Sequence, residues 1–95
     1  MLFPENIQKY DKAIEDFSNV IELGNEVSLA TKRYYEDDNE NVTRYIEAFK
    51  LRGEAYFEKK NYQNAIEDYG RYIQLNPDDL EAVYEKRFAE ILAGN

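Results

Sequence analysis

The residue types that carry most enzyme chemistry are missing from this sequence, which contains no cysteine and no histidine. Thiolate nucleophiles, imidazole bases, disulfides and the usual zinc ligands are therefore excluded. The remaining candidates are Ser18, Ser28, the carboxylates, the lysines and the tyrosines, and their spacing singles out no catalytic cluster. We expect no catalytic site and no cofactor, and hence a protein that is not an enzyme.

The acidic run from Glu36 to Glu40 has the clustered carboxylates that hard cations prefer. It lacks the glycine and the distant glutamate of a calcium-binding loop. A solvated turn is the better interpretation, and we expect no metal site.

The net charge of -8 comes from 20 acidic and 12 basic residues. It repels phosphate backbones and anionic lipid head groups, and the scattered basic pairs form no basic stripe. We therefore expect neither a nucleic acid nor a membrane as partner. No stretch approaches the roughly 20 apolar residues that span a bilayer, and the N-terminus lacks the pattern of a signal peptide. These absences favour a cytoplasmic protein.

Apolar residues recur at helical spacing along most of the 95 residues, while glycine and proline are rare. This pattern predicts a single all-α domain with four to five helices. We expect helices over residues 4–23, 26–36, 41–60 and 80–93, and another that ends before Pro77. Gly24-Asn25 is expected to stop the first helix, Asp78 or Asp79 to cap the last, and Gly94 to end it.

Residues 49–77 form the clearest unit, because two amphipathic stripes are joined there by a short polar turn. Such stripes must face one another, which predicts an antiparallel helical hairpin. Lys59 and Lys60 favour the negative end of the first helix, and Asn61 tolerates the left-handed conformation that closes helices.

An internal repeat links this hairpin to the start of the chain. Residues 10–17, YDKAIEDF, match residues 62–69, YQNAIEDY, and Ile21-Glu22-Leu23 continues the match against Ile73-Gln74-Leu75. The offset from Tyr10 to Tyr62 is 52 residues. A repeated unit of this kind implies stacked, solenoid-like helices.

The hairpin resembles the tetratricopeptide repeat over residues 46–79. The resemblance rests on the family's spacing of large, small and proline positions, here Phe49, Gly53, Tyr56, Ala65, Tyr69 and Pro77. Arg52 and Tyr72 depart from the pattern, at positions where leucine and a small residue are usual. The resemblance implies a TPR-like superhelix of antiparallel helix-turn-helix repeats.

By this resemblance the full repeat is flanked by a partial repeat over residues 4–25 and by a terminal helix over residues 80–93. The offset of 52 residues is 18 longer than the family's period of about 34 residues. We therefore expect an insertion or an extra helix over residues 26–44.

The first helix of each hairpin lines a concave groove in this family, which implies a set of residues that would contact a peptide or protein partner. They are Glu47, Lys50, Glu54, Phe57, Glu58, Glu81, Tyr84 and Phe88. Relatives that grip an acidic chain end use several cations, and here only Lys50 fits that role. The expected function is a protein–protein interaction module, a scaffold or adaptor, without an acidic-tail clamp.

A self-assembly element, or a fragment of a larger repeat protein without a ligand of its own, is the alternative. The first helix shows no preceding partner helix, so a second chain, an upstream segment or the 27–35 segment would have to cover its apolar face. That face comprises Ile7, Tyr10, Ile14, Phe17 and Ile21. Leaving five such side chains exposed would forfeit roughly 7 to 15 kcal/mol, which favours a homo-oligomer as one solution.

Overall fold

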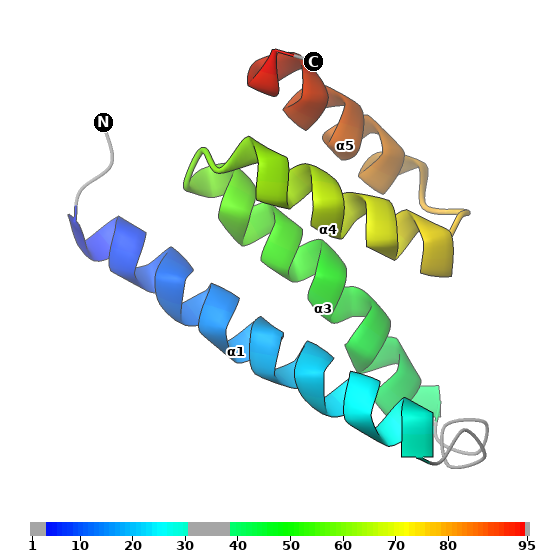
Figure 1. Cartoon of the computed structure of the whole chain (residues 1–95). Coiled ribbons are helices and arrows are strands. Elements are labelled where there is room, and N and C mark those ends of the chain that lie inside the picture. The colour runs from blue at the N-terminus through cyan, green and yellow to red at the C-terminus, as the bar shows by residue number, and fades with distance from the viewer. Residues whose placement is uncertain (1–3, 31–38, 95) are drawn as a thin grey trace.

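The computed structural model describes residues 4–30 and 39–94, which form four helices and, within those ranges, no strand. The helices are α1 (Pro4–Ala30), α3 (Asn39–Glu58), α4 (Tyr62–Leu75) and α5 (Leu80–Ala93). Each helix packs against the next, so that α3 and α4 lie between α1 and α5 (Figure 1). The predicted all-α, helical-repeat fold is confirmed.

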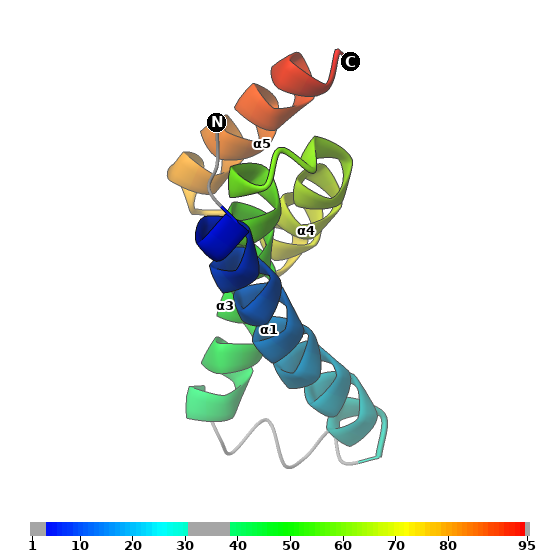
Figure 2. The same ribbon diagram turned by 90° about the vertical axis from the view of Figure 1, so that its left-hand side faces the viewer.

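The molecule is elongated and thin, with extents of 46 × 28 × 17 Å. Figure 2 shows α1 crossing in front of α3, with α5 above them. Because the helices form an open row rather than a closed bundle, α1 and α5 each keep a face that no other helix of residues 4–30 and 39–94 covers.

The α1–α3 pair is antiparallel, and its contacts recur every seven residues. Lys59 pairs with Asp11, the Arg52 Nη1 donates to Ser18 Oγ at 3.0 Å, and the Tyr45 hydroxyl donates to Asn25 Oδ1 at 2.5 Å. Each step of seven residues along α1 is matched by seven residues back along α3. Seven residues are close to two helical turns, so the same face of each helix returns to the interface.

Helix α1 is longer than predicted, since Gly24 does not end it. A Cβ built on Gly24 would lie 2.2 Å from Cδ1 of Tyr45, so this glycine lets α3 approach α1 closely. The prediction of a stop at Gly24-Asn25 was wrong, because this glycine serves packing. The predicted helix over residues 26–36 is also not separate at its start: residues 26–30 continue α1, and residues 31–36 lie outside the described residues.

The helix bounds also explain much of the long offset between the repeats. Leu23 corresponds to Leu75, the last residue of α4, and α1 continues for seven residues beyond it. Helix α3 likewise begins seven residues before Ile46, the first residue of the full repeat over residues 46–79. The extra chain length therefore contributes largely to two extended helices, and the predicted solvated break over residues 36–41 is helical from Asn39 onward.

The α3–α4 turn closes through Lys60 rather than Asn61. Lys60 has a φ of 66°, in the left-handed region, whereas Asn61 has a φ of -91°. The Lys60 amide donates to the Phe57 carbonyl at 2.9 Å and the Asn61 amide to the Tyr56 carbonyl at 2.8 Å. The left-handed residue was therefore predicted one position too late.

The ends of the last two helices agree with the sequence signals. Helix α4 ends at Leu75, just before Asn76-Pro77. The Asp79 side chain accepts a hydrogen bond from the Ala82 amide at 3.2 Å and caps α5, which ends at Gly94 with a φ of 86°. Of the two capping candidates, Asp79 is the cap.

Small residues allow the close α3–α4 crossing. A Cβ on Gly53 would lie 3.1 Å from the ring of Tyr69, and both Ala65 and Tyr69 are buried. Tyr72, which departs from the family pattern, is also buried, and its hydroxyl donates to Asp79 Oδ2 at 2.8 Å. The hairpin therefore presents a fixed surface to α1 on one side and α5 on the other.

Candidate functional site: a groove across α1, α3 and α5

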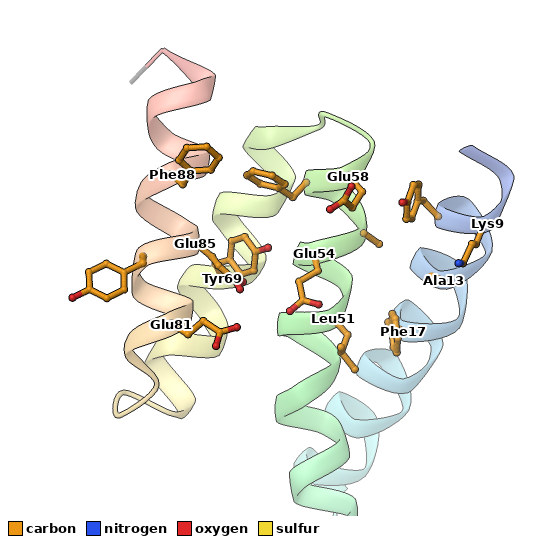
Figure 3. Close-up of a pocket in the computed structure, with 14 residues that line it drawn as sticks. Lys9, Ala13, Phe17, Leu51, Glu54, Glu58, Tyr69, Glu81, Glu85 and Phe88 are labelled. Atoms are coloured by element: carbon orange, nitrogen blue, oxygen red, sulfur yellow. The ribbon is translucent and has the colours of Figure 1, made fainter. Parts of the chain in front are cut away.

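A groove with a volume of about 880 Å³ crosses one face of the row of helices (Figure 3). Helix α3 forms its floor, α1 and α5 form its two walls, and Tyr69 of α4 lies behind it. The lining residues are Lys9, Tyr10, Ala13, Phe17, Leu51, Glu54, Ala55, Phe57, Glu58, Tyr69, Glu81, Tyr84, Glu85 and Phe88.

The two halves of the groove differ in chemistry. Between α1 and α3 it is apolar, and Figure 3 shows Phe17 and Leu51 lying near one another across that half. The half between α3 and α5 is acidic, because it holds all the carboxylates of the lining. They are Glu54 and Glu58 from α3 and Glu81 and Glu85 from α5. Lys9 is the single basic residue among the lining residues.

Two aromatic side chains of α5 are exposed along the groove. Tyr84 is 71% and Phe88 53% exposed to solvent. The Phe88 ring stacks on Phe57 of α3, with ring centroids 5.8 Å apart. Large exposed aromatic side chains at the wall of a concave surface are typical of sites where a partner is bound.

Burial and the repulsion of neighbouring carboxylates make two groove residues, Glu54 and Glu85, harder to ionise. Burial is the main cause that raises the pKa of Glu54, the negative charges of Glu81 and Glu58 add to it, and the Lys50 charge opposes it. Burial also raises the pKa of Glu85, followed by the charge of Glu54 and a hydrogen bond with Glu81. The Glu85 Oε2 atom is buried and has no hydrogen-bond partner.

Tyr69 lies behind these carboxylates, and burial followed by the charges of Glu85 and Glu54 raises its pKa well above the ordinary tyrosine value. Its hydroxyl therefore stays protonated at neutral pH and can only donate or accept hydrogen bonds. Tyr69 thus adds no charge to the acidic half of the groove.

Six of the eight residues expected in the groove line it: Glu54, Phe57, Glu58, Glu81, Tyr84 and Phe88. Glu47 and Lys50 do not. The Lys50 Nζ lies 3.0 Å from Asp79 Oδ2, at the opposite end of α5 from Phe88, and hydrogen bonding to Asp79 raises its pKa. The cation that an acidic chain end would need is therefore already bound by a carboxylate.

The wall from α1 was not predicted as part of the groove. Lys9, Tyr10, Ala13 and Phe17 form it, although the internal repeat likens α1 to α4, a second helix of a hairpin. Leu51, Ala55, Tyr69 and Glu85 were also left out. The unpartnered apolar face of α1 was the one sequence signal that pointed to this wall.

That apolar face of α1 is largely covered by α3. Ile21 is only 5% exposed and joins Ala48 and Phe49 in the core, and Phe17 packs against the same cluster. Tyr10 and Phe17 also line the groove, Ile14 is half-buried, and Ile7 is exposed. The five side chains are therefore not all exposed, because α3, which was not among the covers considered for this face, supplies most of the cover.

Neither a metal site nor a membrane-spanning helix is found in the part of the chain that the structure describes. Residues 4–30 and 39–94 hold no group of three or more acidic side chains placed to bind a metal ion. Within the same residues no helix is long and apolar enough to cross a bilayer. The acidic run from Glu36 lies mainly outside the described residues.

The helix row with one grooved face defines a helical-repeat fold of the kind that binds partners along a concave surface. The family model for the tetratricopeptide repeat matches residues 46–79, about a third of the chain, which confirms the resemblance over that segment. Tetratricopeptide repeats generally mediate protein–protein interactions and are not themselves catalytic. Comparisons with curated proteins and with solved structures gave no significant match.

Proposed function

We propose that this protein is a non-catalytic interaction module, a scaffold or adaptor whose groove binds a segment of a protein partner. The observation that carries the proposal is the exposure of Tyr84 and Phe88 on the wall of a groove of about 880 Å³. A groove of this size accommodates several side chains of a bound segment.

The rings of Tyr84 and Phe88 can contribute to folding of the free protein or to binding of a partner. Tyr84 contributes little to folding by hydrophobic burial, whereas about half of the Phe88 side chain is covered and its ring stacks on Phe57. Covering such a ring with a partner removes a large apolar area from water, and aromatic side chains in concave sites often dominate binding energies. Their exposure is therefore better explained by binding than by stability.

The test is partner capture from cell extract followed by affinity measurement with the purified partner. Tyr84→Ala and Phe88→Ala are each expected to weaken binding by at least tenfold, the loss typical of a central aromatic contact. Leu23→Ala is the matched control, because Leu23 is 62% exposed on α1 and does not line the groove. A partner that binds all three variants equally well would contradict the proposal.

Self-assembly is a second candidate function, favoured by apolar side chains of α5 outside the groove lining. Leu80 and Ile91 are 65% and 63% exposed. A second copy that covered them would remove apolar area from water, although the charge of -8 on each copy opposes association at low salt. Sedimentation across a wide concentration range tests this candidate. A monomer at all concentrations, at both low and high salt, would overturn it.

A further inference from the structure

We infer that the groove recognises a cationic segment, an arginine or lysine side chain flanked by apolar residues, rather than an acidic or neutral one. This inference rests on the proposed function, since it names the chemistry of the partner that the same groove binds.

The distribution of charge within the groove favours a cationic ligand. Its α3–α5 half gathers Glu54, Glu58, Glu81 and Glu85, whereas the single basic residue of the lining, Lys9, lies on the opposite wall. Lys50, whose charge acts on Glu54, is held by Asp79 at 3.0 Å. No side chain of the lining therefore neutralises the acidic half.

The pKa values of Glu54 and Glu85 remain raised although the charge of Lys50 lowers both, because burial and the neighbouring carboxylates outweigh it. Glu54 and Glu85 are partly buried, repel one another and resist ionisation. The Glu85 Oε2 atom is buried without a hydrogen-bond partner, which a native structure seldom tolerates at no cost. A guanidinium or ammonium group placed here would relieve the repulsion among Glu54, Glu81 and Glu85. An anionic ligand would increase it.

Apolar side chains surround the position that a bound guanidinium or ammonium group would occupy. Phe88 and Phe57 adjoin the acidic half, and Phe17 and Leu51 form the apolar half. A segment that carries only charges would leave these side chains exposed, and one that carries only apolar residues would bury the carboxylates without a partner. A cation flanked by apolar residues satisfies both halves.

The test selects blocked peptides from a random twelve-residue display library on the intact protein. We expect selected peptides to be enriched in arginine or lysine beside apolar residues. Phe88→Ala is expected to weaken their binding at least tenfold. Glu54→Gln and Glu85→Gln should each weaken it about tenfold, as loss of a charge-assisted hydrogen bond does. Glu47→Gln, which removes an exposed charge on α3 outside the groove, should change it less than twofold.

The outcomes separate the two proposals. Neutral or acidic peptides that lose affinity in Phe88→Ala would overturn the cationic inference and leave the groove as a binding site. If the selected peptides bind Tyr84→Ala and Phe88→Ala with unchanged affinity, the proposed function is overturned, and the inference with it. We expect both glutamine variants to remain folded, because neutralising a carboxylate that resists ionisation does not remove a stabilising charge. A loss of binding in them therefore reports on the groove.

Discussion

Arg52 of α3 and Asp68 of α4 form a bidentate ion pair. The Arg52 Nε donates to Asp68 Oδ2 and the Arg52 Nη2 to Asp68 Oδ1, each at 2.7 Å. Asp68 is buried, and the third guanidinium nitrogen donates to Ser18 of α1 at 3.0 Å. The hydrogen bond to Asp68 is the main cause that raises the pKa of Arg52. One side chain thus joins three helices, at the position where the family usually has leucine.

Replacing this arginine by the usual leucine should therefore destabilise the fold. Arg52→Leu leaves the Asp68 carboxylate buried without a partner, and we expect the free energy of unfolding in urea to fall by about 3 kcal/mol. Adding Asp68→Ala should recover most of that loss, because no buried charge then remains. Lys12→Ala is the control: it breaks the exposed Lys12–Asp16 pair and should cost less than about 0.5 kcal/mol. If Arg52→Leu and Lys12→Ala lower the free energy of unfolding equally, the expectation is contradicted.

Two helical glycines should respond in opposite directions to alanine. Gly24→Ala places a methyl group 2.2 Å from the Tyr45 ring, and we expect a loss of about 1 to 3 kcal/mol. At Gly70 the nearest atom is Cε of Lys86 at 3.6 Å, so Gly70→Ala should stabilise the protein by about 1 kcal/mol through helix propensity. Urea unfolding of the two variants measures both effects, and a stabilised Gly24→Ala variant would show that α1 and α3 do not pack as described.

Glu54 and Glu85 should make the protein less stable as the pH rises. Because the pKa values of Glu54 and Glu85 are raised in the folded state, the folded protein binds more protons than the unfolded chain above the ordinary value of 4.5. Stability is therefore lost as the pH rises through this window. Glu54→Gln and Glu85→Gln should raise the thermal midpoint at pH 7 and change it less at pH 4. A lower midpoint at pH 7 would contradict the described burial.

Asp79 should have the opposite pH dependence. Hydrogen bonds from Tyr72, from Lys50 and from the Ala82 amide lower the pKa of Asp79 to about 2. Its contribution is therefore present above the unfolded value of 3.8 and is lost as the pH falls toward 2. Asp79→Ala should lower the thermal midpoint at pH 7 and remove this acid sensitivity. The neighbouring, exposed Asp78→Ala is the control and should leave the midpoint nearly unchanged.

The features that the sequence predicted well depend on local signals. The hairpin, the end of α4 before Pro77, the Asp79 cap and the Gly94 stop each follow from residues within a turn or two. Gly24 was misinterpreted because a glycine that ends a helix and one that permits close packing look alike in sequence. Only Tyr45, on another helix, distinguishes them.

The site was predicted only in part for a similar reason. The family pattern indicates which helices face the groove, and Glu54, Tyr84 and Phe88, which it selected, line it. It does not say that α1 crosses α3 so that Phe17 forms the opposite wall. Nor does it reveal that Asp79, whose capping role is a local signal, also binds Lys50 and removes it from the groove.

The extensions of α1 beyond Leu23 and of α3 before Ile46 have the same length, seven residues each. An equal addition of two turns to two antiparallel helices preserves every contact face, because the α1–α3 contacts themselves recur at seven-residue steps. The added turns lie beyond Leu23 and before Ile46, away from the residues that line the groove. A heptad added to or removed from both extended helices would therefore leave the residues that line the groove in place.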